Sequence, residues 1–139
     1  LWYIDDVDRT VVRGLNFTGY ARQGLWIGGI PARVEDGTFA WNGIYGLLAQ
    51  QADDIEIEKN SFVANGNGGL RLSDDDGAVV SGNHIWFNNV ERANTAWDAA
   101  GVKVDRTEDA LFRNNLVERN FATGIWFDTN TFRLMTVEN

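Results

Sequence analysis

The chain has 139 residues, one histidine and no cysteine, and its formal net charge is −8. This length suffices for one domain with a hydrophobic core. The acidic balance argues against a nucleic-acid-binding protein, which would present a basic face to phosphates, and the lack of cysteine excludes disulfides. No apolar run is long enough for a membrane-spanning helix, and no signal peptide is visible. We expect one domain over residues 1–139 that is part of a longer protein.

The sequence repeats with a period near 23 residues. Most copies begin with a pair of apolar residues. Three residues after the second of the pair comes a turn position, and two residues after that comes another apolar residue. A strand that begins with glycine completes the copy. The turn position is occupied by Asn60, Asn83 and Asn115, but by Leu15 and Gly37 in the first two copies. In chain order, the second apolar residues of the pairs are Val12, Val34, Ile57, Val80, Phe112 and Val137.

The copies predict strands rather than helices, because no segment sustains the apolar spacing of an amphipathic helix. A coil in which each copy makes one turn, and pairs with its neighbours along the axis, gives every strand a partner. We therefore predict an all-β solenoid of three parallel sheets around a narrow core. Strands are expected at 24–27, 46–49, 69–72, 101–104 and 124–127, at 55–57, 78–80 and 110–112, and near residues 62, 85 and 117.

The pattern resembles the right-handed, single-stranded parallel β-helix of the pectate-lyase-like superfamily, with about five to six rungs. In that family the three strands of a rung are called PB1, PB2 and PB3, and an asparagine ladder often occupies the PB2–PB3 turn. The resemblance makes Asn60, Asn83 and Asn115 the ladder and the glycine-led strands PB1. Asn42, Asn65, Asn88 and Asn120 are expected to be further turn residues or a second ladder.

Polar side chains gather on the outer face of the predicted PB1 sheet. Strand alternation directs Arg71, Lys103 and Trp126 outward on successive rungs, with Trp26 four rungs from Trp126. Asp105 and Asp128 follow two positions after Lys103 and Trp126. Residues 89–100 are inserted directly before a PB1 strand, where the family places a long loop. We therefore expect a groove with Lys103 and Arg71 exposed in it, walled by that loop.

The resemblance implies that this groove binds a polysaccharide. Tryptophan faces stack on sugar rings, and arginine can pair with a uronate carboxylate. We expect Trp26, Trp126, Trp97 and Arg92 to bind substrate. The reaction expected first is β-elimination, in which Lys103 removes a proton and Arg71 neutralises the charge that develops on the carboxyl group. Asp74, Asp75 and Asp76 are a candidate Ca²⁺ site, since calcium prefers oxygen ligands.

Other interpretations stay open. Asp105 and Asp128 could form the carboxylate pair of a glycoside hydrolase. Alternatively, the coil is a non-catalytic stalk, adhesin or binding module, and the charged row is ordinary solvated surface. Further rungs or a neighbouring chain could pack against the ends. The resemblance also implies a secreted or cell-surface protein.

Overall fold

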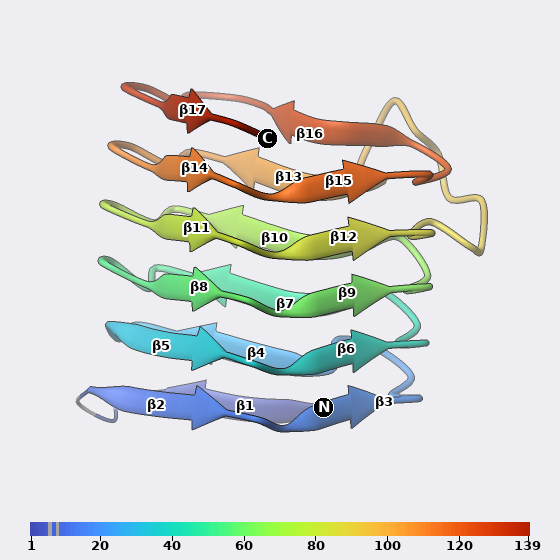
Figure 1. Cartoon of the computed structure of the whole chain (residues 1–139), viewed down its shortest axis with the longest axis horizontal. Coiled ribbons are helices and arrows are strands. Elements are labelled where there is room, and N and C mark those ends of the chain that lie inside the picture. Colours follow the sequence, from blue (N-terminus) through green and yellow to red (C-terminus); the bar gives the residue numbers. More distant parts are fainter. Residues whose placement is uncertain (6, 8) are drawn as a thin grey trace.

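The computed structural model describes residues 1–5, 7 and 9–139, with the backbone alone for Met135 and Val137. The chain winds into stacked rungs, with the N-terminus at one end of the stack and the C-terminus at the other (Figure 1). All strand pairs are parallel, and each strand pairs with its equivalent one rung away. Each rung contributes one strand to each of three sheets, except the last described rung, which contributes to two, and this confirms the predicted parallel β-solenoid.

The described residues form PB1 and PB2 sheets of six strands each and a PB3 sheet of five. The PB1 sheet consists of β1 (Trp2–Asp5), β4 (Leu25–Gly28), β7 (Tyr45–Gln50), β10 (Gly68–Ser73), β13 (Ala100–Asp105) and β16 (Thr123–Phe127). The PB2 sheet consists of β2 (Thr10–Arg13), β5 (Ala32–Glu35), β8 (Glu56–Glu58), β11 (Val79–Ser81), β14 (Leu111–Arg113) and β17 (Met135–Val137). The PB3 sheet consists of β3 (Asn16–Thr18), β6 (Thr38–Ala40), β9 (Ser61–Val63), β12 (His84–Trp86) and β15 (Leu116–Glu118).

The predicted register holds along most of the coil. Val34, Ile57 and Val80 pair in sequence, and Val80 pairs with Phe112. The alignment was wrong at the last rung, where Phe112 pairs with Thr136 rather than with Val137. Val137 is apolar and follows Thr136, so the sequence alignment placed the repeat one residue too late. The backbone pairing places Val137 beside Arg113. The three predicted PB2 strands also begin one residue later than expected.

The core is a set of apolar columns, one or two per sheet. Phe17, Phe39 and Phe62 stack on successive rungs, with ring centroids 5.0 and 4.8 Å apart. Leu70 and Leu72 on β10 are both fully buried, whereas Arg71 between them faces outward. This alternation leaves one face of each sheet for the core and the other for solvent or loops.

Two asparagine ladders run along the coil. In the PB2–PB3 turn, the Asn83 amide donates to Asn115 Oδ1 at 2.9 Å and to the carbonyl of Ile57 at 2.9 Å. Its Oδ1 accepts from the backbone N–H of Asn60. The ladder continues to Asn139, which the shifted alignment at Val137 had hidden. The second ladder, between PB3 and PB1, consists of Asn42, Asn65, Asn88 and Asn120.

The glycine that begins a PB1 strand is required by a close approach between rungs. A Cβ added to Gly46 would lie 2.7 Å from the carbonyl oxygen of Gly69 and 2.8 Å from the Cβ of Phe39. Both neighbours belong to the rigid coil, so neither can move away. Only glycine therefore fits at position 46, where the chain passes from the PB3 sheet into the PB1 sheet.

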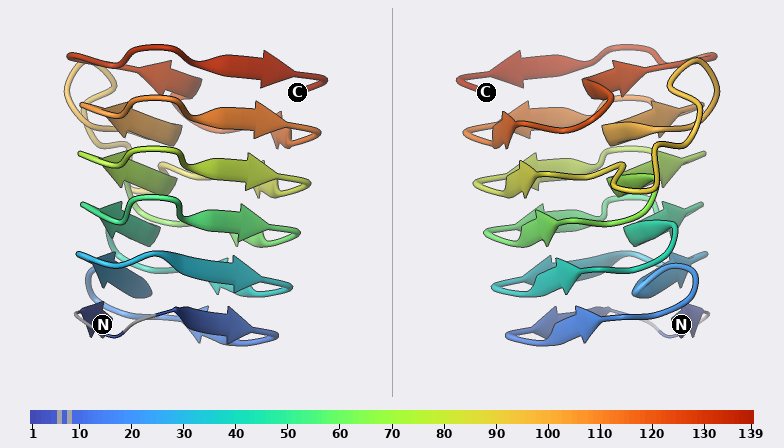
Figure 2. Two further views of the ribbon diagram at one scale, coloured as in Figure 1. Left: turned by 90° about the vertical axis from the view of Figure 1, so that its left-hand side faces the viewer. Right: turned by 90° about the vertical axis from the view of Figure 1, so that its right-hand side faces the viewer.

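The insertion is a loop that connects β12 to β13 and lies beside the PB1 sheet, reaching along several rungs (Figure 2, right). It is anchored at its start by Asn89, whose side chain bonds to the backbone of Ala93 and Phe121. Near its end, Tyr45 of β7 donates its hydroxyl to the carbonyl of Asp98 at 2.8 Å. The loop is therefore held against the sheet at both ends. The described chain has no helix with the length and apolarity to cross a membrane.

Candidate functional site

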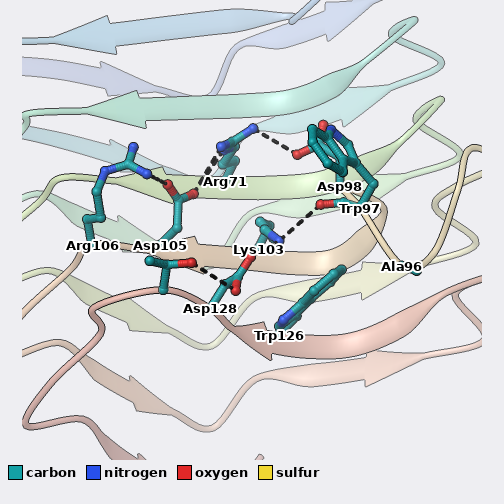
Figure 3. A pocket seen from close by; sticks show the side chains of 10 residues that line it. Arg71, Ala96, Trp97, Asp98, Lys103, Asp105, Arg106, Trp126 and Asp128 are labelled. Carbon is teal, nitrogen blue, oxygen red and sulfur yellow. Dashed lines mark hydrogen bonds and ion pairs between the residues drawn. The ribbon is translucent and has the colours of Figure 1, made fainter.

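The outward row of the PB1 sheet and the inserted loop enclose a cavity of about 410 Å³, called the loop cavity below. Arg71, Lys103 and Trp126 pair in register on β10, β13 and β16, which brings them together. Ala96, Trp97 and Asp98 approach from the loop (Figure 3). The cavity is lined by Arg71, Ala96, Trp97, Asp98, Lys103, Asp105, Arg106, Trp126, Asp128 and Thr129.

Lys103 faces outward as predicted, but the expectation that it is exposed was wrong. Only 2% of the residue is accessible to solvent. Its Nζ donates to Asp128 Oδ2 at 2.6 Å and to the carbonyl of Trp97 at 3.3 Å, and lies 3.3 Å from the centroid of the Trp126 ring. These are the contacts of an ammonium cation. The loop and the next rung together cover a side chain that alternation alone places on the surface.

Asp105 is buried between two arginines. Arg71 reaches its Oδ1 at 3.1 Å, and Arg106 reaches its Oδ2 at 2.7 Å. Ser73 also donates to Oδ2, at 3.1 Å. A carboxylate that is 3% exposed needs such partners, because an unpaired buried charge is costly. These contacts make Asp105 the centre of an ion-pair network.

Asp128 is the most accessible carboxylate of the loop cavity, with 35% of its side chain exposed. The hydrogen bond from Lys103 is the main reason that its pKa lies below the usual value, and the N–H of Thr129 adds to the effect. The Thr129 hydroxyl donates to the other oxygen, Oδ1, at 3.2 Å. Asp128 is therefore an ionised, oriented carboxylate at the edge of the cavity.

The loop contributes one charged and one aromatic side chain to the cavity. Asp98 accepts from Arg71 at 2.8 Å, and Trp97 is 80% exposed. Arg92, the other loop residue predicted to bind substrate, does not line the cavity. Its guanidinium lies over the Phe121 ring, 3.8 Å from the centroid. A cation–π contact of this kind holds Arg92 away from the groove.

Trp26 is on the expected face but does not line the loop cavity. It lies on β4, where the Tyr3 ring packs against it with a centroid distance of 4.7 Å. Its indole Nε1 is buried and has no hydrogen-bond partner among the described residues. The structure therefore does not bring Trp26 together with Trp126 in one site.

The acidic turn after β10 does not fit a calcium site. Both oxygens of Asp74 bond to Arg106, and both oxygens of Asp75 accept backbone N–H groups, from Ala52 and Ser73. Asp76 joins the next rung through a bridge to Glu108. In the part of the chain that the structure describes, no three Asp, Glu or His side chains converge as a metal site does.

A family model described as a right-handed β-helix region matches residues 23–139. The chain belongs to this family. Among solved structures, this β-helix is similar to a protein of Parabacteroides merdae ATCC 43184 that is provisionally described as a glycosyl hydrolase. The TM-score is 0.65 at 7% identity, over 97% of this chain and 76% of that chain. An identity so low shows a shared fold alone.

A second similarity is too weak to indicate a shared fold. QnrB1, a plasmid-mediated fluoroquinolone resistance protein, aligns with a TM-score of 0.25 at 7% identity, over 88% of this β-helix and 92% of that chain. No curated protein matches the sequence.

Sequence reasoning missed several residues of the site. Arg106 follows β13 directly and holds both Asp105 and Asp74, and Tyr45 and Asp98 fasten the loop. The position of Arg106 one residue after Asp105 was a usable signal, since the end of a PB1 strand borders the groove. Asp98 belongs to the loop that the sequence predicts as a wall of the groove, but no sequence signal marked its contact with Tyr45, which joins residues 53 positions apart.

A second cavity of about 350 Å³ lies beside the loop cavity on the same sheet. The two share Arg71, Asp98 and Arg106, so the Arg71–Asp98 ion pair lies between them. Its other walls come from residues nearer the N-terminus: Arg22, Gln23, Ile44, Tyr45, Leu48, Gln50 and Ser73.

Proposed function

We propose that this β-helix binds an acidic polysaccharide on its PB1 sheet and cleaves it by β-elimination. The observation that carries the proposal is the loop cavity, where Trp97 and Trp126 lie beside three cationic side chains. Lys103, Arg71 and Arg106 are each paired with an aspartate there, and a uronate carboxylate can take the place of such a partner. Such polymers lie outside cells, and we therefore also propose a secreted or cell-surface location.

In the proposed reaction, Arg71 or Arg106 neutralises the carboxyl group of the sugar that reacts. Lys103 first loses its ammonium proton to solvent, and the neutral amine then takes the C5 proton. The electron pair of the C5–H bond moves into the carboxyl group, and a C4–C5 double bond forms as the leaving oxygen departs from C4 with a proton from solvent. For this role Lys103 must separate from Asp128 and from the carbonyl of Trp97, which now cover it. Binding of substrate beneath the loop is the event that would separate them.

Glycoside hydrolysis is the second candidate, and the exposure of Asp128 favours it. An ionised carboxylate at the cavity edge suits the base or nucleophile of such a reaction. The proposed partner, Asp105, is less suited to the acid role, because its oxygens already accept bonds from Arg71, Arg106 and Ser73. The description given to the Parabacteroides merdae protein is in line with hydrolysis but concerns that protein.

The experiment is a pair of assays on a panel of uronic-acid polysaccharides. Ultraviolet absorbance reports new carbon–carbon double bonds, and a reducing-end assay reports cleavage by either route. Native protein should produce both signals, and Lys103→Met should lose the absorbance while its circular dichroism stays unchanged. Reducing ends without absorbance, abolished by Asp128→Asn, would replace elimination with hydrolysis. If neither signal appears on any polymer, the enzyme proposal fails.

Binding is tested separately by tryptophan variants. Trp97→Ala should weaken polysaccharide binding by roughly tenfold, because one aromatic stacking surface is lost. The matched control is Trp41→Ala, since Trp41 is 66% exposed, lies in the turn after β6 and lines neither cavity. Equal effects of the two substitutions would contradict the proposed groove.

A further inference from the structure

The second cavity has no role in the reaction proposed above, yet one of its walls holds a buried amide without a partner. Gln23 precedes the first residue of β4 by two positions and is 7% exposed. Its Oε1 has no hydrogen-bond partner within the described residues. A buried, unpaired acceptor reduces stability, so such groups are rare in folded proteins.

The asparagine amides elsewhere in the coil make this exception informative. Asn60, Asn65 and Asn83 each donate to a carbonyl and to the next ladder oxygen, and each accepts in turn. The buried ladder amides, which have a structural role, therefore all have hydrogen-bond partners. Gln23 lines a cavity and has an acceptor left over, which is the arrangement expected of a residue that receives a hydrogen bond from a ligand.

The charges of the second cavity differ from those of the loop cavity. The loop cavity is lined by three cations and three aspartates, which balance: Arg71, Lys103 and Arg106 against Asp98, Asp105 and Asp128. The second cavity is lined by Arg22, Arg71 and Arg106 against Asp98 alone. Arg22 forms no ion pair with any described residue, unlike the other two arginines. Within the described part of the chain, Arg22 is thus the cation of this cavity that a ligand carboxylate can approach without displacing another carboxylate.

We propose that the second cavity is a binding site for one uronic acid residue. A sugar hydroxyl donates to Gln23 Oε1, and the carboxylate pairs with the Arg22 guanidinium. This inference rests on the proposed function, because the residue bound there belongs to the same polysaccharide that enters the loop cavity. The two cavities share the Arg71–Asp98 pair, so the polymer crosses that pair and runs along the coil axis from β16 towards β4.

Monosaccharides test the site without relying on catalysis. Glucuronate and galacturonate are titrated to about 50 mM, a range that detects even weak single-residue binding, while the Gln23 side-chain amide is followed by NMR. The amide signals are assigned from their loss in Gln23→Met. We expect them to shift with both acids and to shift less with glucose and galactose. No shift with either acid would overturn the assignment of this cavity.

Variants separate this inference from the function on which it rests. Gln23→Met should fold normally, with a melting temperature no lower than native, yet bind acidic oligosaccharides about three- to tenfold more weakly. Arg22→Gln should weaken binding of the acidic oligosaccharide but not of its carboxyl-reduced form. Arg113→Gln on the outer face of the PB2 sheet is the charge control and should change neither.

The outcomes are distinct. If Trp97→Ala weakens binding but Gln23→Met and Arg22→Gln do not, the loop cavity binds the polymer and the second cavity does not. If the Gln23 amide responds to uronates but no polymer is cleaved, the second cavity stands as a binding site and the enzyme proposal falls.

Discussion

At the scale of single residues, the asparagine side chains of the ladders hydrogen-bond backbone groups in the turns, as neighbouring strands do for one another within the sheets. Asn83 lies in a turn between two sheets, where its side chain bonds backbone groups of the preceding rung. Its side chain accepts from the N–H of Asn60 and donates to the carbonyl of Ile57, both at 2.9 Å. Both backbone groups are buried, and an unpaired one would reduce the stability of the coil.

Substituting Asn83 should therefore destabilise the protein strongly. Asn83→Ala leaves two backbone groups without a partner and removes one hydrogen bond from each neighbouring ladder amide, and we expect a loss of roughly 3–5 kcal/mol in the free energy of unfolding. Urea unfolding checks this value. Asn139→Ala is the matched control, because Asn139 is exposed at the end of the ladder and water can replace it. Similar losses in the two variants would contradict this account.

Asp75 predicts a dependence of stability on pH. Burial raises the pKa of its carboxyl group from 3.8 to about 7, although the N–H groups of Ala52 and Ser73 act in the opposite direction. Because the folded-state pKa is above the unfolded one, the stability from the protonated carboxyl is fully present below pH 3.8. It is lost as the pH rises through about 7.

Asp75→Asn removes this titration. An amide has only one acceptor oxygen for the two N–H groups, so the variant should be less stable than the native protein at pH 4. The gap should narrow towards pH 8, where the native carboxylate is charged and buried. Urea unfolding at pH 4, 6 and 8 measures the gap, and a constant gap would show that Asp75 does not titrate in this range.

At the scale of elements, the inserted loop converts an ordinary strand face into a site. Without it, Lys103 would lack the Trp97 carbonyl, and Arg71 would lack Asp98. The coil itself does not need the loop, since the steps between other equivalent residues are near 23 and this one is 32. The loop therefore adds the cavity to a scaffold that is complete without it.

Deleting residues 91–99 tests this division of roles. The deletion restores a step of 23 between Asn83 and Asn115, so the rungs should still stack and the circular dichroism should remain that of a β-solenoid. Polysaccharide binding should fall to the level of Trp97→Ala or lower. Loss of the folded spectrum would mean that the loop stabilises the coil rather than only forming the site.

At the scale of the whole molecule, each rung of the coil pairs only with its neighbours, apart from the loop contact with Tyr45, so stability is distributed along the axis. The central strands β7, β10 and β13 are hydrogen-bonded on both sides and enclose a fully buried core. The described strands at the two ends of each sheet have one partner each. Parallel pairing over rung-length separations also predicts slow folding.

Amide hydrogen exchange should follow this arrangement. We expect the slowest exchange in β7, β10 and β13, and faster exchange towards β1–β3 and β15–β17, because end rungs open without disrupting the centre. Native-state exchange followed by mass spectrometry would resolve the rungs. Equal protection along the whole axis would indicate one all-or-none unit instead.

The sequence by itself determined the coil. The period near 23, the Phe17–Phe39–Phe62 column and the ladder from Asn60 to Asn115 all reappear in register, because a solenoid repeats its local chemistry at a fixed step. The same regularity explains the error at Val137. This apolar residue fits the repeat pattern, but the residue that pairs with Phe112 is Thr136, one position earlier.

Only the tertiary structure decided which side chains on the outer face of the PB1 sheet are exposed and which are covered. Alternation gives the side of the sheet on which Lys103 lies, but not whether that side is covered. Covering depends on a loop that obeys no period and on contacts such as that of Tyr45 with Asp98, between residues far apart in the chain. Burial of Lys103 and Asp105, and the unpaired amide of Gln23, arise from that packing, which no local pattern encodes.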